Sequence, residues 1–189
     1  SIRYAASRCG SVQADEGEAG GITGVNRAGQ GIRDCINYGN VTSSDGYAGG
    51  ITATNAGTIT DCQVKAADKG TLKIHSAGVK ESGAICGINT GVIRAANDSR
   101  TMADNTVLLS GKATIYGGIT GSASGTISGC EFDGTVKAVK DLKNGQSGLT
   151  YLGGITGDFS SAVSAVESDR DENAEDFAGI VNCVNKGNI

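Results

Sequence analysis

Short apolar segments alternate with glycine and polar residues along the whole chain. The clearest recurring unit is a pair of small residues followed by isoleucine, and successive copies start 29, 34, 34 and 36 residues apart. These anchors are Gly20-Gly21-Ile22, Gly49-Gly50-Ile51, Gly83-Ala84-Ile85, Gly117-Gly118-Ile119 and Gly153-Gly154-Ile155. Each anchor begins a β-prone segment that ends at polar or small residues.

Two further apolar segments follow each anchor. The second is marked by Ile32, Ile59, Ile93, Ile127 and Ile180. The third is clearest in 39–41, 70–74, 106–109 and 134–136. A period of about 30 residues built from short strands is typical of a solenoid, because one unit alone cannot bury its apolar face. We therefore predict an all-β parallel β-helix of about five to six three-stranded coils, right-handed as in the commoner parallel β-helices.

Composition supports strands over helices and narrows the choice of partner. Glycine supplies 31 of 189 residues, and each would cost a helix about 1 kcal/mol. The net charge is −4 and Lys and Arg are scattered singly, so we expect no nucleic-acid partner. No apolar run approaches the ~20 residues that cross a bilayer, so we expect no membrane insertion of this segment.

The repeat also resembles a known family. The pattern G-G-I-x-G-x-N-x-G-x-I-x-x-C-x-N-x-G-x-V, matched best by residues 20–41, is similar to the GLUG motif. That motif occurs in bacterial surface and secreted proteins, including immunoglobulin A peptidases of the M26 class. The resemblance implies an extracellular, cell-surface or secreted location in a large modular protein, and it implies no reaction.

The domain organisation follows from the repeat phase. We expect one β-solenoid domain over 1–189, excised from a larger protein that carries further domains, because Gly10-Ser11-Val12 and Gly187-Asn188-Ile189 share one phase without a cap. Residues 158–178 form an acidic insertion in the last repeat, which is where a partner surface is expected first.

Cysteine and asparagine recur at fixed phases, and we interpret both as structural ladders. The ladder residues are Cys35, Cys62, Cys130 and Cys183 for cysteine, and Asn26, Asn55 and Asn89 for asparagine. The sequence has no C-x-x-C pair, so a zinc site is not indicated. We interpret the cysteine column as small buried thiols, and a disulfide between Cys35 and Cys62 is an alternative. Stacked asparagines pass amide hydrogen bonds along the axis, with ligand binding as the weaker alternative.

Candidate catalytic and metal groups are sparse. His75 is the single histidine, and H-E-x-x-H is absent. Asp169, Asp171 and Asn173 resemble the start of a calcium loop but lack its glycine and final glutamate. Asp34 and Asp61 share a phase and would stack about 5 Å apart, as in a retaining glycosidase, yet we expect both to face solvent. We predict no enzyme activity, no metal and no cofactor.

Two functions remain open from the sequence. The first is a non-catalytic surface module, either an adhesin segment that binds a host or cell-surface protein or glycan, or a rigid spacer. The second is an accessory, substrate-capturing domain of a secreted peptidase or glycan-active enzyme. A wall-anchoring signal elsewhere in the parent chain would favour the first, and a downstream catalytic domain the second.

Overall fold

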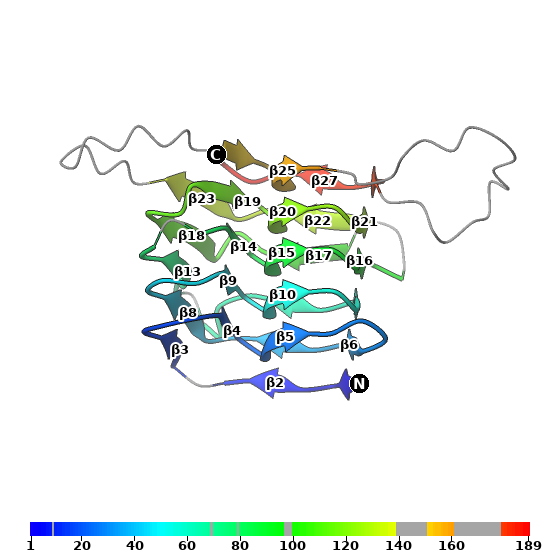
Figure 1. The fold of residues 1–189 in the computed structure, drawn as a ribbon, viewed down its shortest axis with the longest axis horizontal. Coiled ribbons are helices and arrows are strands. Elements are labelled where there is room, and N and C mark those ends of the chain that lie inside the picture. The colour runs from blue at the N-terminus through cyan, green and yellow to red at the C-terminus, as the bar shows by residue number, and fades with distance from the viewer. Residues whose placement is uncertain (9, 69, 79, 97–99, 139–150, 161–178) are drawn as a thin grey trace, which may run out of the picture.

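The computed structural model is a stack of coils in which every strand pairs with the equivalent strand of the next coil (Figure 1). It describes residues 1–189 except 9, 69, 79, 97–99, 139–150 and 161–178. All strand pairs are parallel, and the strands form five sheets, which we name A to E. The predicted parallel β-helix is confirmed.

Within sheets A, B and C the strands stack in the order in which they occur along the chain. Sheet A contains β1 (Ile2–Arg3), β6 (Gly31–Arg33), β11 (Thr58–Thr60), β16 (Val92–Arg94), β21 (Thr126–Ser128) and β26 (Ile180–Val181). Sheet B contains β2 (Ala6–Ser7), β7 (Ile36–Asn37), β12 (Gln63–Val64), β17 (Arg100–Ala103), β22 (Cys130–Phe132) and β27 (Val184–Asn185). Sheet C contains β3 (Ser11–Ala14), β8 (Asn40–Ser43), β13 (Leu72–Ser76), β18 (Val107–Gly111) and β23 (Thr135–Ala138).

The two remaining sheets carry the glycine anchors and the segment that follows them. Sheet D contains β4 (Ala19–Gly20), β9 (Ala48–Gly49), β14 (Ser82–Gly83), β19 (Ile115–Gly117) and β24 (Tyr151–Gly153). Sheet E contains β5 (Thr23–Asn26), β10 (Thr52–Asn55), β15 (Cys86–Asn89), β20 (Thr120–Ala123) and β25 (Thr156–Phe159).

Each complete coil thus has five short strands, where the sequence predicts three. Two of the expected segments are bent in the middle. The Gly-Gly-Ile segment bends between sheets D and E, where the amides of Ile51 and Thr52 both donate to the carbonyl of Ile85 in the next coil, at 3.0 and 3.1 Å. The second segment bends between sheets A and B, where Asp34 and Asp61 have positive φ values of 53° and 54°.

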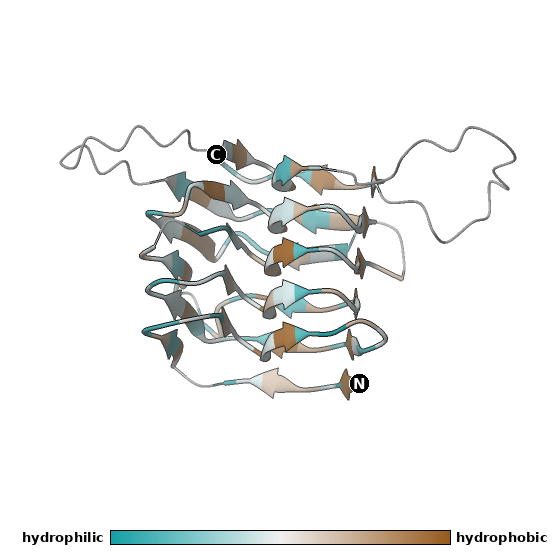
Figure 2. Ribbon diagram, viewed as in Figure 1, coloured by the Kyte–Doolittle hydropathy of each residue, from teal (hydrophilic) through white to brown (hydrophobic). Residues whose placement is uncertain are grey.

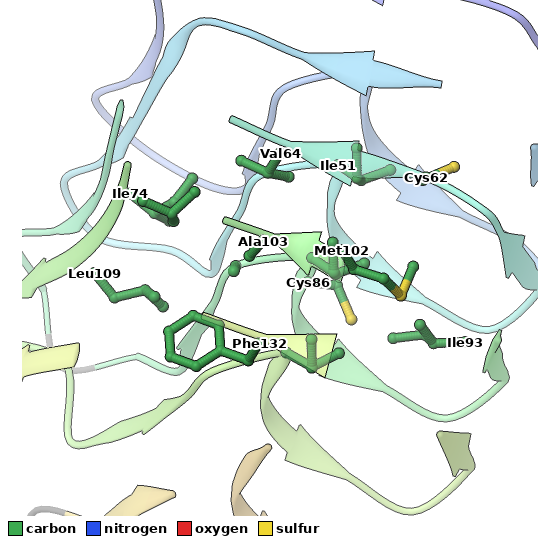
Figure 3. Close-up of a cluster of buried hydrophobic side chains, with 14 of the residues drawn as sticks. Ile51, Cys62, Val64, Ile74, Cys86, Ile93, Met102, Ala103, Leu109 and Phe132 are labelled. Atoms are coloured by element: carbon green, nitrogen blue, oxygen red, sulfur yellow. The ribbon is translucent and has the colours of Figure 1, made fainter. Parts of the chain in front are cut away.

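The interior is filled by aliphatic columns that run along the stack (Figure 3). Ile32, Ile59, Ile93 and Ile127 pair in register on sheet A, and each is at most 1% exposed. Further columns are Ile51, Ile85 and Ile119 at the D–E bend, and Val41, Ile74, Leu109 and Val136 on sheet C. Hydrophobic segments therefore recur along sheet A, at the right of Figure 2.

The first glycine of each anchor is required by close backbone packing. A Cβ at Gly49 would overlap the carbonyl oxygen of Thr52, and the equivalent overlap occurs at Gly20, Gly83, Gly117 and Gly153. These glycines lie where the chain folds back on itself at the D–E bend. No other residue type fits there without a backbone shift.

The second anchor position is limited by a backbone carbonyl of the next coil and by the side chain that faces it across the coil. A Cβ at Gly50 would lie 2.2 Å from the carbonyl oxygen of Ala84 and 2.6 Å from a methyl of Val64, and a Cβ at Gly118 would lie 2.5 Å from the Phe132 ring. Val64, Ala103 and Phe132 are register partners on sheet B. Ala84 is the single second-anchor residue that is not glycine, and by this register it faces Ala103. The larger anchor residue is thus accompanied by a smaller side chain on sheet B.

We expect Gly49→Ala to destabilise the fold by about 3 kcal/mol, because its methyl meets backbone that cannot move aside without breaking the bend. Gly24→Ala is the matched control, since a Cβ there has no neighbour closer than 3.7 Å. Urea unfolding of both variants measures the difference. Equal stabilities would contradict the packing explanation.

The pairing of Ala84 with Ala103 predicts a compensating double variant. Ala103→Val alone should cost about 1–3 kcal/mol by overpacking. Adding Ala84→Gly recreates the Gly50 and Val64 arrangement, so the two changes should be coupled by at least about 0.5 kcal/mol in the favourable direction. A double-mutant cycle from denaturant unfolding gives this coupling. Strict additivity would show that the two side chains do not meet.

Candidate functional site

The predicted asparagine ladder is a continuous buried chain of amide hydrogen bonds. Asn26 Nδ2 donates to Asn55 Oδ1 at 2.7 Å, and Asn55 Nδ2 donates to Asn89 Oδ1 at 2.7 Å. Asn89 Nδ2 ends the ladder at the carbonyl of Thr126, 3.2 Å away. The three side chains are at most 4% exposed. Their amides hold neighbouring coils together and are directed away from solvent.

A threonine column beside this ladder was missed by sequence reasoning. Thr52 Oγ1 donates to the carbonyl of Thr54 at 3.0 Å and also lies 3.0 Å from the carbonyl of Gly24 in the neighbouring coil. Thr120 and Thr156 repeat both contacts. The signal was present, because threonine follows the anchor isoleucine in every copy except Cys86.

The predicted cysteine column caps the corner between sheets A and B. The thiols of Cys35, Cys62, Cys130 and Cys183 each lie 3.2–3.4 Å from the carbonyl oxygen two residues earlier. Each thiol also lies 3.4–3.9 Å from the carbonyl of an isoleucine in the preceding coil. All described cysteines are free, and Cys9 lies outside the described residues.

The thiols of this column differ in acidity. Burial raises the pKa of Cys62 to about 12, and burial does the same to Cys86 in the threonine column. A hydrogen bond with Cys130 lowers the pKa of Cys183 to about 7, while that hydrogen bond and burial raise the pKa of Cys130. Cys183 is also the one described cysteine that is not fully buried.

Asp34 and Asp61 occupy the same left-handed corner on neighbouring coils but have different surroundings. Asp34 is partly exposed and pairs with Arg33 at 3.3 Å. Asp61 is 6% exposed, accepts the amide of Ala96 at 2.9 Å and lies 3.8 Å from Arg100. The expectation that both carboxylates face solvent is therefore wrong for Asp61, because its carboxylate is used to close the corner.

The other candidate chemical groups do not form a described cluster. His75 Nδ1 lies 3.4 Å from Ser110 Oγ on the outer side of sheet C. Asp169, Asp171 and Asn173 lie outside the described residues, as does most of the insertion 158–178. Within the described part of the chain, no group of three or more His, Cys, Asp or Glu could hold a metal ion. No helix among the described residues is long and apolar enough to cross a membrane.

A shallow hollow of about 180 Å³ opens at the N-terminal end of sheets A and E. Its lining consists of Ser1, Ile2, Thr23, Val25, Asn26, Arg27, Gln30 and Gly31. Small-molecule sites usually enclose about 300–1,000 Å³. The hollow is therefore smaller than a typical small-molecule site.

The register also gathers arginines that are distant in the sequence. Arg3 pairs with Arg33, and Arg94 occupies the same column two coils further along sheet A. All three are exposed. We call Arg3, Arg33 and Arg94 the arginine column. Sequence reasoning missed it, although the signal was present for two of its members: Arg33 and Arg94 directly follow Ile32 and Ile93, which share one repeat phase.

Comparisons with known proteins give no relative from which a role could be transferred. No protein-family model, no curated protein and no solved structure matches the chain. The resemblance to GLUG-motif repeats stays a prediction.

Asn55→Ala should destabilise the fold by about 3 kcal/mol, because it removes two ladder hydrogen bonds and leaves the Asn26 amide without its acceptor in a buried place. Asn105→Ala, at an exposed loop position, should change stability by less than about 0.5 kcal/mol. Denaturant unfolding of the two variants makes the comparison. A similar small effect at both positions would argue against the ladder.

Thiol labelling tests the cysteine column. At pH 8 in the native protein, iodoacetamide should modify Cys183 well before Cys62 and Cys86, because of these three thiols only that of Cys183 combines exposure with a lowered pKa. Peptide mapping by mass spectrometry identifies the sites, and Cys183→Ser should remove its rapid labelling. Rapid native labelling of Cys62 or Cys86 would contradict their burial.

Proposed function

We propose that this chain is a non-catalytic, extracellular repeat module of a bacterial cell-surface protein, acting as an adhesin segment or a rigid spacer. The observation that carries the proposal is that the recurring polar side chains of the interior bond one coil to the next. The Asn26–Asn55–Asn89 ladder, the threonine column and the cysteine column all make such contacts. Their donors are thereby occupied within the fold.

The shape supports the same proposal. Stacked coils about 4.8 Å apart make a rod whose sheets present long outer faces, on which side chains repeat at the coil spacing. Such a face suits an extended partner, and the continuous core resists bending. The bacterial surface location rests on the resemblance to GLUG repeats. An accessory role beside a secreted peptidase or glycan-active enzyme would use the same outer faces for substrate capture.

An array of glycans and extracellular host proteins tests the proposal, followed by mass spectrometry of every ligand that binds. We expect saturable binding with each ligand recovered at its original mass. If no ligand on the array binds, the result would favour the spacer role over the adhesin role. Cleaved glycan or peptide in the recovered ligand, lost on heat denaturation of the protein, would contradict a non-catalytic module.

A further inference from the structure

The arginine column is placed by the same register that forms the core. On sheet A the isoleucines at 32 and 93 point inward, and the residues that follow them, Arg33 and Arg94, are exposed; Thr60, which lies between them in the register, is buried. Arg3 and Arg33 lie on adjacent coils, about 4.8 Å apart, and Arg94 lies about 9.6 Å beyond Arg33. The three arginines therefore start from positions in one line parallel to the rod axis, with Thr60 between Arg33 and Arg94.

This arrangement does not strengthen the fold. Like charges that stand directly opposite each other on neighbouring strands are destabilising, and Arg3 and Arg33 are such a pair. The buried isoleucine, asparagine, threonine and cysteine columns are made instead of residues that attract or tolerate their own copies. A stacked pair of exposed arginines is thus better explained by an anion that they bind together.

The guanidinium groups are positioned and remain accessible. Arg94 Nε donates to Thr60 Oγ1 at 3.5 Å, which fixes the side chain over the coil below. Arg33 has an exposed ion pair with Asp34 at 3.3 Å, a type of contact that contributes little and can be shared with a ligand. Arg100 and the buried Asp61 neutralise each other next to the column.

The surface beside the column carries glycine, threonine and valine. The neighbouring outward positions on sheet A are Gly31, Thr58, Val92 and Thr126, which pair in register. Tyr4, next to Arg3 at the corner, is 78% exposed. An extended polymer can lie along such a surface, with its anionic groups on the arginines and one sugar ring against the tyrosine.

We propose that the outer face of sheet A binds an acidic polysaccharide, a linear glycan that carries sulfate or carboxylate groups. The inference rests on the proposed function and names the ligand class for its adhesin form. Arginine forks bind both anions in bidentate geometry. The chain of the glycan runs parallel to the rod axis.

The observations favour a polysaccharide over other polyanions. Single-stranded nucleic acid needs aromatic platforms for its bases, whereas among the described residues the column has one neighbouring exposed aromatic residue, Tyr4. An acidic protein would need pockets for buried anchor residues at the centre of its interface, and the hollow at Gly31 is smaller than a typical small-molecule site.

The test measures binding of the whole 189-residue protein at low salt by isothermal titration calorimetry. The probes are heparin, polygalacturonate, neutral dextran, poly-glutamate and single-stranded DNA. The variants are Arg33→Gln/Arg94→Gln and, as a control with the same change of charge, Lys73→Gln/Lys137→Gln on the outer face of sheet C. Circular dichroism confirms that each variant is folded.

We expect heparin or polygalacturonate to bind the native protein, with an affinity that falls as salt rises. The double arginine variant should weaken that binding at least about tenfold, and the double lysine variant should leave it within about threefold. Tyr4→Ala should weaken binding of the acidic glycan and leave any binding of poly-glutamate unchanged.

Three results would overturn the inference. They are no binding of either acidic glycan, an equal loss in the two double variants, and binding of poly-glutamate or DNA that matches or exceeds that of the glycans. The protein could also bind neither acidic glycan but bind a neutral glycan or a protein on the array. That result would refute the arginine column as a glycan site and would leave the proposed function as a binding module standing.

Discussion

The repeated positions in the interior of this fold must tolerate their own copies as neighbours, because parallel coils stack in register about 4.8 Å apart. This constraint selects the residue types of each column. An asparagine amide both donates and accepts, so Asn26, Asn55 and Asn89 form a chain of hydrogen bonds. Isoleucine columns fill the interior, and glycine stands where two segments of backbone nearly touch. The sequence repeats because equivalent residues of successive coils stack on one another.

The same constraint separates the interior from the outer faces. Inside, the threonine and cysteine columns satisfy carbonyl groups at the bends, so that the backbone can turn sharply without losing hydrogen bonds. Outside, side chains are free to vary from coil to coil. A column that repels itself, such as Arg3 over Arg33, is therefore informative about function in a way that the buried columns are not.

The parts of the structure that repeat were predictable from the sequence, and the parts that depend on local bends were not. The isoleucine spacing predicts the parallel stack and its columns. The five-stranded coil was missed because Asp34 and Asp61 adopt a left-handed conformation that is uncommon for residues other than glycine. The burial of Asp61 depends on the same bend. It could not be predicted, because its partner Arg100 lies in the next coil. The place of Arg3 in the arginine column required the register, because no isoleucine before Ile32 was assigned to this phase from the sequence, whereas Arg33 and Arg94 directly follow aligned isoleucines.

Nuclear Overhauser contacts between asparagine side-chain amides test the self-stacking most directly. With selectively labelled asparagine, the account predicts strong cross-peaks between the amides of Asn26 and Asn55 and between those of Asn55 and Asn89, residues 29 and 34 positions apart in the chain. It predicts no cross-peak between Asn26 and Asn89, which are separated by a whole coil. Side-chain amides that exchange rapidly with solvent and show no mutual contacts would contradict the stacked coil.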